Sequence, residues 1–280
     1  MLRLTPVNVI KIGHCRKTKN QTNSCKETAA VCSCNRSCNN TKRTYIGVAS
    51  GGGGVKSKIF DGDYNLIKVF NKKKHFWDIT ATNDNELVFA DGSNKLYFYT
   101  AEGKPIREVF MKGYATIRGI TALSTGQLVV CDSHTEIVYL VDRCTGDATA
   151  ISATETFIYA RRVATNSKDV IVISDRYNHT VYGFDQAGNV LFTYGNGTSG
   201  SGEGQLSYPM GVYTDSEDYI VVADENNHRV HLLTREGNFH SYLLTESDGV
   251  NSPLSVGMNQ DGQILVGDDR GQLFTITYRE

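Results

Sequence analysis

Short hydrophobic runs recur along this chain in one register. Each run places two bulky apolar residues before a small residue and an aspartate, and the five aspartates are 41, 43, 49 and 44 residues apart. A period of about 40 to 50 residues, built from β-branched and aromatic runs with polar turns between them, is typical of four-stranded β-propeller blades. The runs are LVFAD (87–91), LVVCD (128–132), VIVISD (170–175), YIVVAD (219–224) and ILVGD (264–268).

The polarity within and after each run predicts the order of strands in a blade. The run IVVA (220–223) shows no polar alternation, so both faces of this strand should be buried between neighbouring blades. After the aspartate the chain turns and resumes an alternating strand, as at Val230 and Leu232, and a second turn such as REGN (235–238) leads to an outer strand. The pattern therefore predicts an all-β fold of repeated blades.

One repeat carries a specific resemblance. The segment YPMGVYTDSEDYIVVADENNHRVHLLTREGN (208–238) resembles an NHL repeat, including the pair Asn-His at 227–228, and the same pair recurs at 178–179. The glycine-rich GNGTSGSGEGQLSYPMG (195–211) resembles the connector between NHL blades. This resemblance implies an NHL β-propeller like the carboxyl end of tripartite-motif (TRIM-NHL) ubiquitin ligases, where such domains select protein or RNA targets.

The end of the last repeat predicts how the ring closes. The chain stops after a third strand, QLFTITY (272–278), which leaves an unpaired edge. The alternating VNVIKI (7–12) is suited to cover that edge. We therefore predict a six-bladed β-propeller in which residues 1–13 give the closing strand, 14–44 a Cys-rich flexible insertion, and 45–280 the NHL propeller.

Charge and cysteine content divide the chain at residue 44. Residues 1–44 hold nine Lys/Arg and one acid, which leaves the body of the chain at −9 and argues against broad nonspecific nucleic-acid affinity. Five cysteines lie in 14–44, but they lack the paired C-x₂-C spacing of zinc fingers. No apolar stretch reaches the roughly 18 residues of a membrane span, and the start lacks a secretory h-region. We therefore expect a cytoplasmic protein with no membrane partner.

Two sets of repeated polar residues resemble functional sites but have a simpler interpretation. Every run ends in an aspartate followed by a turn, so we expect the carboxylates to cap turn amides. His134, His179 and His228 occupy one type of turn in three consecutive repeats. Peptide-amidating lyases resemble this fold and use zinc-bound histidines, but zinc needs ligands that converge on one point. The sequence therefore predicts no catalytic residue, no metal and no cofactor.

The candidate binding site is a basic arc on one face. In a propeller the connections into the first strand of each blade share a face, here called the top face, with the turns between second and third strands. Phe76, Trp77, Tyr114 and Tyr159 lie beside the arc, although we expect Trp77 in the core, and the opposite face should be acidic. Cations among stacking aromatics suit single-stranded RNA or an acidic peptide. The arc comprises Lys72, Lys73, Lys74, His75, Lys112, Arg118, Arg161 and Arg162.

These observations predict a non-catalytic platform that binds a protein partner on its top face, as the recognition part of a TRIM-NHL-type ubiquitin ligase. Two alternatives stay open. One is binding of single-stranded or hairpin RNA by the basic arc, and the other is a metal-dependent lyase or hydrolase of propeller type. The partner, and whether this chain is a fragment of a longer ligase, are left open by the sequence.

Overall fold

A computed structural model describes residues 8–11, 29–38, 41–50, 57–61, 65–70, 76–113, 115–153, 155–259 and 261–278, with side chains from residue 57 onward. Their regular elements are β-strands, apart from the short 3-10 helices η1 (Glu225–Asn227) and η2 (Glu246–Asp248). Within these ranges, no helix combines the length and the apolar character needed to cross a membrane.

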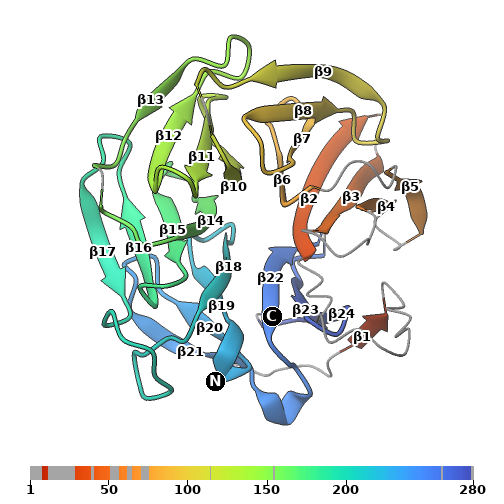
Figure 1. Ribbon diagram of the computed structural model, residues 1–280. Helices are drawn as coiled ribbons and strands as arrows, with labels where there is room; N and C mark the ends of the chain where they lie inside the picture. The colour runs from red at the N-terminus through yellow and green to blue at the C-terminus, as the bar shows by residue number, and fades with distance from the viewer. Residues whose placement is uncertain are drawn as a thin grey trace, which may run out of the picture.

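Five consecutive blades run from β6 to β24 (Figure 1), and their side chains are described as well. Neighbouring strands in each blade pair antiparallel in chain order. The first two blades are β6 (Asp78–Ala81), β7 (Leu87–Ala90), β8 (Lys95–Tyr99) and β9 (Pro105–Phe110), then β10 (Ile117–Ala122), β11 (Leu128–Asp132), β12 (Ile137–Val141) and β13 (Ala148–Ala150). The next three are β14 (Ala160–Thr165), β15 (Ile171–Asp175), β16 (Thr180–Phe184) and β17 (Val190–Tyr194), then β18 (Pro209–Thr214), β19 (Ile220–Asp224), β20 (Arg229–Leu233) and β21 (Phe239–Leu244), then β22 (Pro253–Met258), β23 (Ile264–Asp268) and β24 (Gln272–Ile276).

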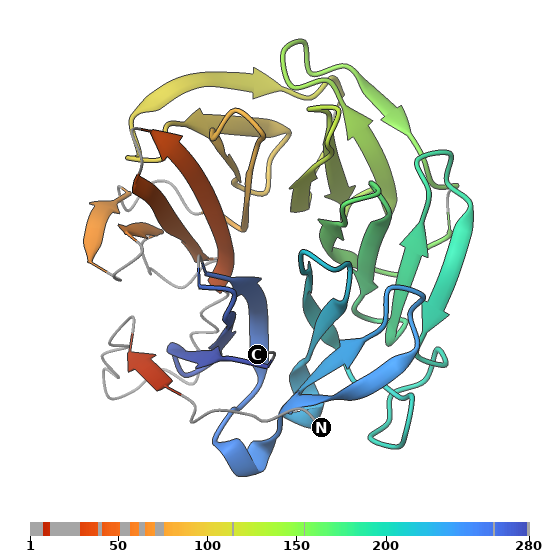
Figure 2. The ribbon, with the colours of Figure 1, turned by 180° about the vertical axis from the view of Figure 1, so that it is seen from behind.

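The blades are arranged around a common centre, with the first strand of each blade innermost and the fourth at the rim (Figures 1 and 2). The inner strands of successive blades contact one another, β6 with β10, β10 with β14, β14 with β18, and β18 with β22. The arrangement therefore brings equivalent positions of the repeat together at the centre of the molecule.

The second strand of each blade is buried on both faces, as the unbroken apolar runs predict. All side chains of β7, β11, β15, β19 and β23 are buried. They join clusters that bridge adjacent blades, such as the one that packs Val88 and Phe98 against Ile120 and Val130. Each fully buried side chain of this kind contributes about 1.5 to 3 kcal/mol, so a slip of one residue in register would be strongly unfavourable.

The aspartates that end these strands cap backbone amides, as predicted. Asp132 accepts hydrogen bonds from the N–H groups of Thr116 (2.8 Å) and His134 (2.9 Å), and so ties the loop before an inner strand to the turn after the second strand. Capping occurs in the other four blades as well: Asp91 accepts from Ser93, Asp175 from Ile158 and Tyr159, Asp224 from Ser207, and Asp268 from Arg270 and Gln272.

The N-terminal strands are described by their backbone pairing. A further four-stranded sheet consists of β2 (Ala29–Cys38), β3 (Thr41–Ser50), β4 (Lys58–Asp61) and β5 (Leu66–Val69), and β1 (Asn8–Lys11) pairs antiparallel with β24. Strand β2 and the start of β3 lie where we expected a flexible insertion (14–44). The structure thus shows an all-β propeller with five blades described to their side chains. The six-bladed ring closed by an N-terminal strand stays a prediction.

Candidate functional site

The inner strands carry two layers of equivalent residues. The first layer, farther from the top face, is the channel layer. Each of its residues lies opposite the small residue of the second strand in the same blade, as Gly119 lies opposite Cys131 and Arg162 opposite Ser174. The residue immediately before it, closer to the top face, belongs to what we call the mouth layer. The mouth layer consists of Trp77, Arg118, Arg161, Met210 and Leu254, and the channel layer of Asp78, Gly119, Arg162, Gly211 and Ser255.

β-Bulges determine how the mouth layer is presented. The pairing between first and second strands shifts at Arg118, at Arg161 and at Leu254, which leaves each as an extra residue in its inner strand. A bulge breaks the regular alternation of side chains and redirects the residue that it contains. This is why Arg161 and Arg162, which are adjacent in sequence, both contribute to one cluster.

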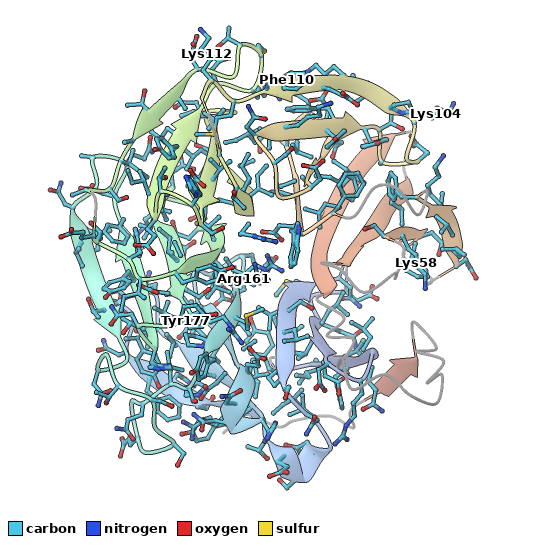
Figure 3. All side chains as sticks on the ribbon, viewed as in Figure 1. Lys58, Lys104, Phe110, Lys112, Arg161 and Tyr177 are labelled. Atoms are coloured by element: carbon cyan, nitrogen blue, oxygen red, sulfur yellow. The ribbon has the colours of Figure 1, made fainter. Side chains whose placement is uncertain are left out.

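Three arginines and one tryptophan meet where the mouth layer adjoins the channel layer; we call these four residues the arginine cluster. The guanidinium carbon of Arg118 lies 3.7 Å from the ring centre of Trp77, and that of Arg161 lies 5.2 Å from the same side chain. Arg162 donates from Nη1 to the backbone oxygen of Arg118 at 2.5 Å. Gly92, with a φ of +83°, leaves room for the indole, because a Cβ there would lie 2.8 Å from it. Figure 3 shows Arg161 near the centre of the ring of blades.

The guanidinium groups of the cluster are buried with incomplete hydrogen bonding. Arg161 is 6% exposed and Arg162 4% exposed. Among the described residues, five nitrogens have no hydrogen-bond partner: Nε and Nη1 of Arg118, Nη1 of Arg161, and Nε and Nη2 of Arg162. Desolvation lowers the pKa of Arg118 and of Arg161, and the positive charge of Arg162 acts in the same direction. Arginine nevertheless stays protonated at neutral pH, so the cluster keeps three positive charges.

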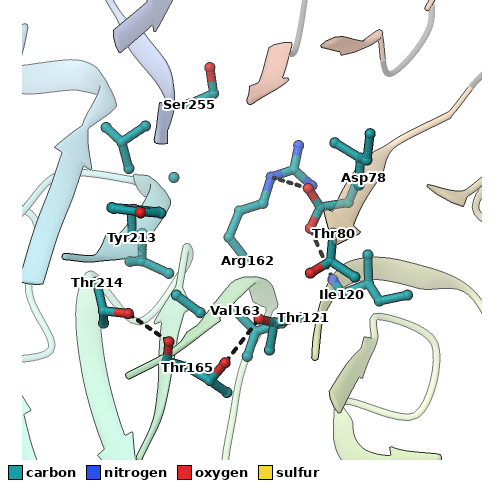
Figure 4. A pocket seen from close by; sticks show the side chains of 15 residues that line it. Asp78, Thr80, Ile120, Thr121, Arg162, Val163, Thr165, Tyr213, Thr214 and Ser255 are labelled. Atoms are coloured by element: carbon teal, nitrogen blue, oxygen red, sulfur yellow. Dashed lines mark hydrogen bonds and ion pairs between the residues drawn. The ribbon is translucent and has the colours of Figure 1, made fainter. Parts of the chain in front are cut away.

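Asp78 is the carboxylate that faces this cluster. Its Oδ1 lies 4.0 Å from Nε of Arg162, and its Oδ2 accepts a hydrogen bond from the Ile120 N–H at 2.9 Å (Figure 4). Desolvation raises the pKa of Asp78, and the opposing effect of Arg162 is smaller. Asp78 therefore offsets at most one of the three positive charges.

A cavity of about 210 Å³ lies beneath the cluster, between the inner strands β6, β10, β14, β18 and β22. Asp78 and Arg162 line it (Figure 4). Threonines make part of its wall polar: the hydroxyl oxygens of Thr121 and Thr165 lie 3.2 Å apart, and Thr214 donates to the backbone oxygen of Thr165 at 2.7 Å. The arginine cluster thus stands at the mouth of a small, partly polar channel.

Aromatic side chains extend from the cluster over the top face. Tyr159 lies 5.8 Å from the guanidinium of Arg161 and packs on Tyr177, with ring centres 4.9 Å apart. Tyr177 meets Tyr208 edge-on at 5.9 Å, and Arg176 lies over both of these rings. Because Tyr177 is 48% exposed, this tyrosine row is accessible to a partner.

The structure separates the predicted basic arc into parts. Arg118, Arg161 and Arg162 come together, whereas Lys112 lies at the rim, exposed and paired with Asp147 (Figure 3). Lys72, Lys73, Lys74 and His75 lie outside the described residues, as does Tyr114.

The expectation that Trp77 lies in the core was wrong. Its ring is half-buried and packs on Arg118, whereas Phe76 beside it is fully buried among aromatic rings. Phe76 and Trp77 both precede β6, which begins at Asp78, so strand alternation in the sequence does not decide which of the two side chains enters the core.

The histidines at equivalent turns link successive blades. Nδ1 of His179 accepts the N–H of Tyr208 at 3.1 Å, and Nδ1 of His228 accepts the N–H of Ser252 at 2.9 Å. Both acceptors therefore fix the loop before the next inner strand, which agrees with their interpretation as turn residues.

Comparison with known proteins supports the fold alone. No model of a known protein family matches the chain, and no curated protein matches its sequence. Virginiamycin B lyase from Staphylococcus aureus, in a catalytically inactive form with quinupristin, is 11% identical, with a TM-score of 0.64 over 97% of this chain and 99% of that one. The WD40 β-propeller domain of Doa1 is 13% identical, with a TM-score of 0.64 over 90% and 79%. An auxiliary nutrient binding protein from Bacteroides ovatus is 16% identical, with a TM-score of 0.66 over 84% and 66%. These similarities place the chain among β-propellers of varied function.

Proposed function

We propose that this protein is a non-catalytic recognition module that binds an anionic partner at the mouth of its central channel. The observation that carries the proposal is the set of five buried guanidinium nitrogens without a hydrogen-bond partner in the described residues. Leaving such a group unsatisfied costs about 1 to 3 kcal/mol, and more when it is charged. A ligand with anionic oxygen atoms would satisfy these donors, so the cluster is more favourable with a ligand than without one.

The burial of the arginines favours a protein partner over RNA. A nucleic-acid backbone tracks along an open, positively charged groove. Arg161 and Arg162 are instead nine-tenths buried or more, which suits the insertion of one side chain or one chain end. The tyrosine row beside the mouth offers a surface for the flanking residues of a peptide, since aromatic residues are enriched at such interfaces.

Capture of partners from cells tests this proposal. The wild-type chain is immobilised and crosslinked to its partners in a cell lysate. We expect it to capture a defined set of proteins. The Arg161→Met variant should no longer capture them, and the Lys112→Gln variant should capture them as the wild type does. Lys112 is the matched control because it is a cation on the same propeller but lies at the rim. Nuclease treatment should leave the captured proteins unchanged; if it removes them, or if both variants behave like the wild type, the proposal fails.

The resemblance to NHL repeats extends this proposal to a biological setting. A recognition propeller of that kind would serve as the substrate-selecting part of a cytoplasmic TRIM-NHL-type ubiquitin ligase. The residues that support it are the Asn-His pairs, whose histidines bind the next blade through Nδ1. Recovery of ubiquitin-ligase subunits or their substrates in the same capture experiment would support this setting, and their absence would argue against it.

We also propose that the propeller is a six-bladed ring. The pairing of β1 with β24 supports this arrangement, as do the contacts of β2 with both β22 and β6. In such a ring the N-terminal strand completes the last blade.

A further inference from the structure

We infer that the channel mouth binds a single phosphoryl group, carried by a phosphorylated residue of the protein partner. This inference rests on the proposed function, because it names the chemical group that the recognition site takes. It goes beyond general affinity for anions by specifying both charge and shape.

The charge of the site matches a dianion. Arg118, Arg161 and Arg162 supply three positive charges, and Asp78 offsets at most one. The only ion pair of these arginines within the described ranges is that between Arg162 and Asp78. A phosphate monoester carries about −1.5 to −2 at pH 7, whereas a carboxylate carries −1 and would leave positive charge buried.

The available donors also match the acceptors of a phosphoryl group. The five nitrogens without a hydrogen-bond partner come from three different side chains and two adjacent inner strands. Guanidinium groups form paired, charge-assisted hydrogen bonds to phosphate oxygens, and three terminal oxygens can accept from several arginines at once. A planar carboxylate has two oxygens and would leave more of these donors unsatisfied.

The burial of the site limits the ligand to one group, since Arg161 and Arg162 are nine-tenths buried or more. The cavity that Arg162 and Asp78 line below the mouth is about 210 Å³, smaller than the roughly 300 to 1,000 Å³ of pockets that enclose a whole small molecule. Trp77 packs against Arg118 and borders the mouth. The tyrosine row begins at Tyr159, beside Arg161, and continues outward over the top face. The phosphoryl group would therefore enter the mouth while the rest of the ligand lies on Tyr159 and Tyr177.

Calorimetric titration with three small aromatic anions tests the inference. Phenyl phosphate is a tetrahedral dianion at pH 7.5, phenyl sulfate a tetrahedral monoanion, and benzoate a planar monoanion. We expect phenyl phosphate to bind at least about tenfold more tightly than either monoanion, and to lose that advantage at pH 5, below the second phosphate pKa of about 6. Equal binding of the three anions, or no binding of phenyl phosphate, would overturn the inference.

Two variants locate the binding. Arg161→Met should weaken phenyl phosphate binding at least tenfold, and Lys112→Gln should leave it unchanged. Circular dichroism and the melting temperature establish that each variant is folded. Unaltered binding by a folded Arg161→Met would overturn the inference.

The outcomes separate this inference from the proposed function. If Arg161→Met abolishes partner capture but phenyl phosphate neither binds nor competes, recognition at the mouth stands and the phosphoryl assignment fails. If capture survives both the substitution and competition by phenyl phosphate, both fail. Phosphatase treatment of the lysate should remove the captured partner if both are correct.

Discussion

Arg161 occupies a position that two other blades fill with apolar side chains. Its equivalents are Met210 and Leu254, which are 3% and 1% exposed. Arg162 likewise takes the place of Gly119 and Gly211. A repeat that tolerates small or apolar residues at these positions does not need arginine for folding, and such a local departure is expected at a functional site.

Replacement of Arg161 by its repeat equivalent should therefore stabilise the unliganded protein. Arg161→Met removes a buried charge that has guanidinium neighbours, and a buried charge without an ion-pair partner is unfavourable for folding. We expect a higher free energy of unfolding in urea together with the loss of ligand binding. A loss of stability of more than about 1 kcal/mol would show that the arginine has a structural role.

His231 is fully buried and lies between Tyr194 and Asp224, with a hydrogen bond to each. Desolvation lowers its pKa, although the hydrogen bond to Asp224 opposes that shift. Below the unfolded-state pKa of about 6.5, the unfolded chain binds a proton that the folded chain does not. The stability associated with His231 is thus fully present above that pH and falls as the pH decreases toward the folded-state value.

Urea unfolding at pH 7.5 and pH 5.5 measures this effect. The slope that one such group adds is at most about 1.4 kcal/mol per pH unit. We expect His231→Gln to be less stable than the wild type at pH 7.5 but to depend less on pH. An equal pH dependence of the two proteins would mean that His231 does not titrate differently on folding.

Turns between first and second strands connect neighbouring blades through hydrogen bonds. Asp169 accepts hydrogen bonds from the N–H and the hydroxyl of Ser124 in the preceding blade, at 2.8 and 2.5 Å. Asp218 binds Ser167 in the same way. Both aspartates are buried. We expected the face that carries these turns to be acidic, but these two acids link blades and contribute little negative charge to its surface.

Asp169→Asn should destabilise the protein by about 1 to 3 kcal/mol, because it weakens charge-assisted hydrogen bonds between two blades. Asparagine tolerates the positive φ of 58° at this position, so backbone strain does not contribute. Asp261→Asn is the matched control, since residue 261 is exposed. The prediction fails if both substitutions change the unfolding free energy equally.

The repeated elements were largely predictable from the sequence, because apolar runs, capping aspartates and turns recur at a fixed period. The burial of the second strands and the role of the five aspartates followed from that pattern. The geometry of the site did not, because it depends on bulges at Arg118 and Arg161 that shift the pairing by one residue. An alignment of the inner strands would have singled out Arg161 and Arg162, since they replace apolar or small equivalents.

The closing strand is the feature on which a stable ring would depend. Deletion of residues 1–13 removes β1 and exposes the edge of β24, so we expect a lower melting temperature and self-association through that edge. A loss of about 1 to 2 kcal/mol corresponds to roughly 2 to 8 °C for a domain of this size. Deletion of residues 1–7, which leaves β1 intact, is the control; identical melting of the two truncations would contradict closure by this strand.

We expect a ligand to reach the arginine cluster through the channel mouth. A ¹H–¹⁵N spectrum of the arginine Nε–H groups, recorded during titration with phenyl phosphate, tests it directly. We predict that the resonances of Arg118, Arg161 and Arg162 shift together and saturably, while that of Arg143, which pairs with Asp84 on an outer turn, does not move. Saturable shifts that bypass these three arginines, or no shift at any concentration, would contradict the account.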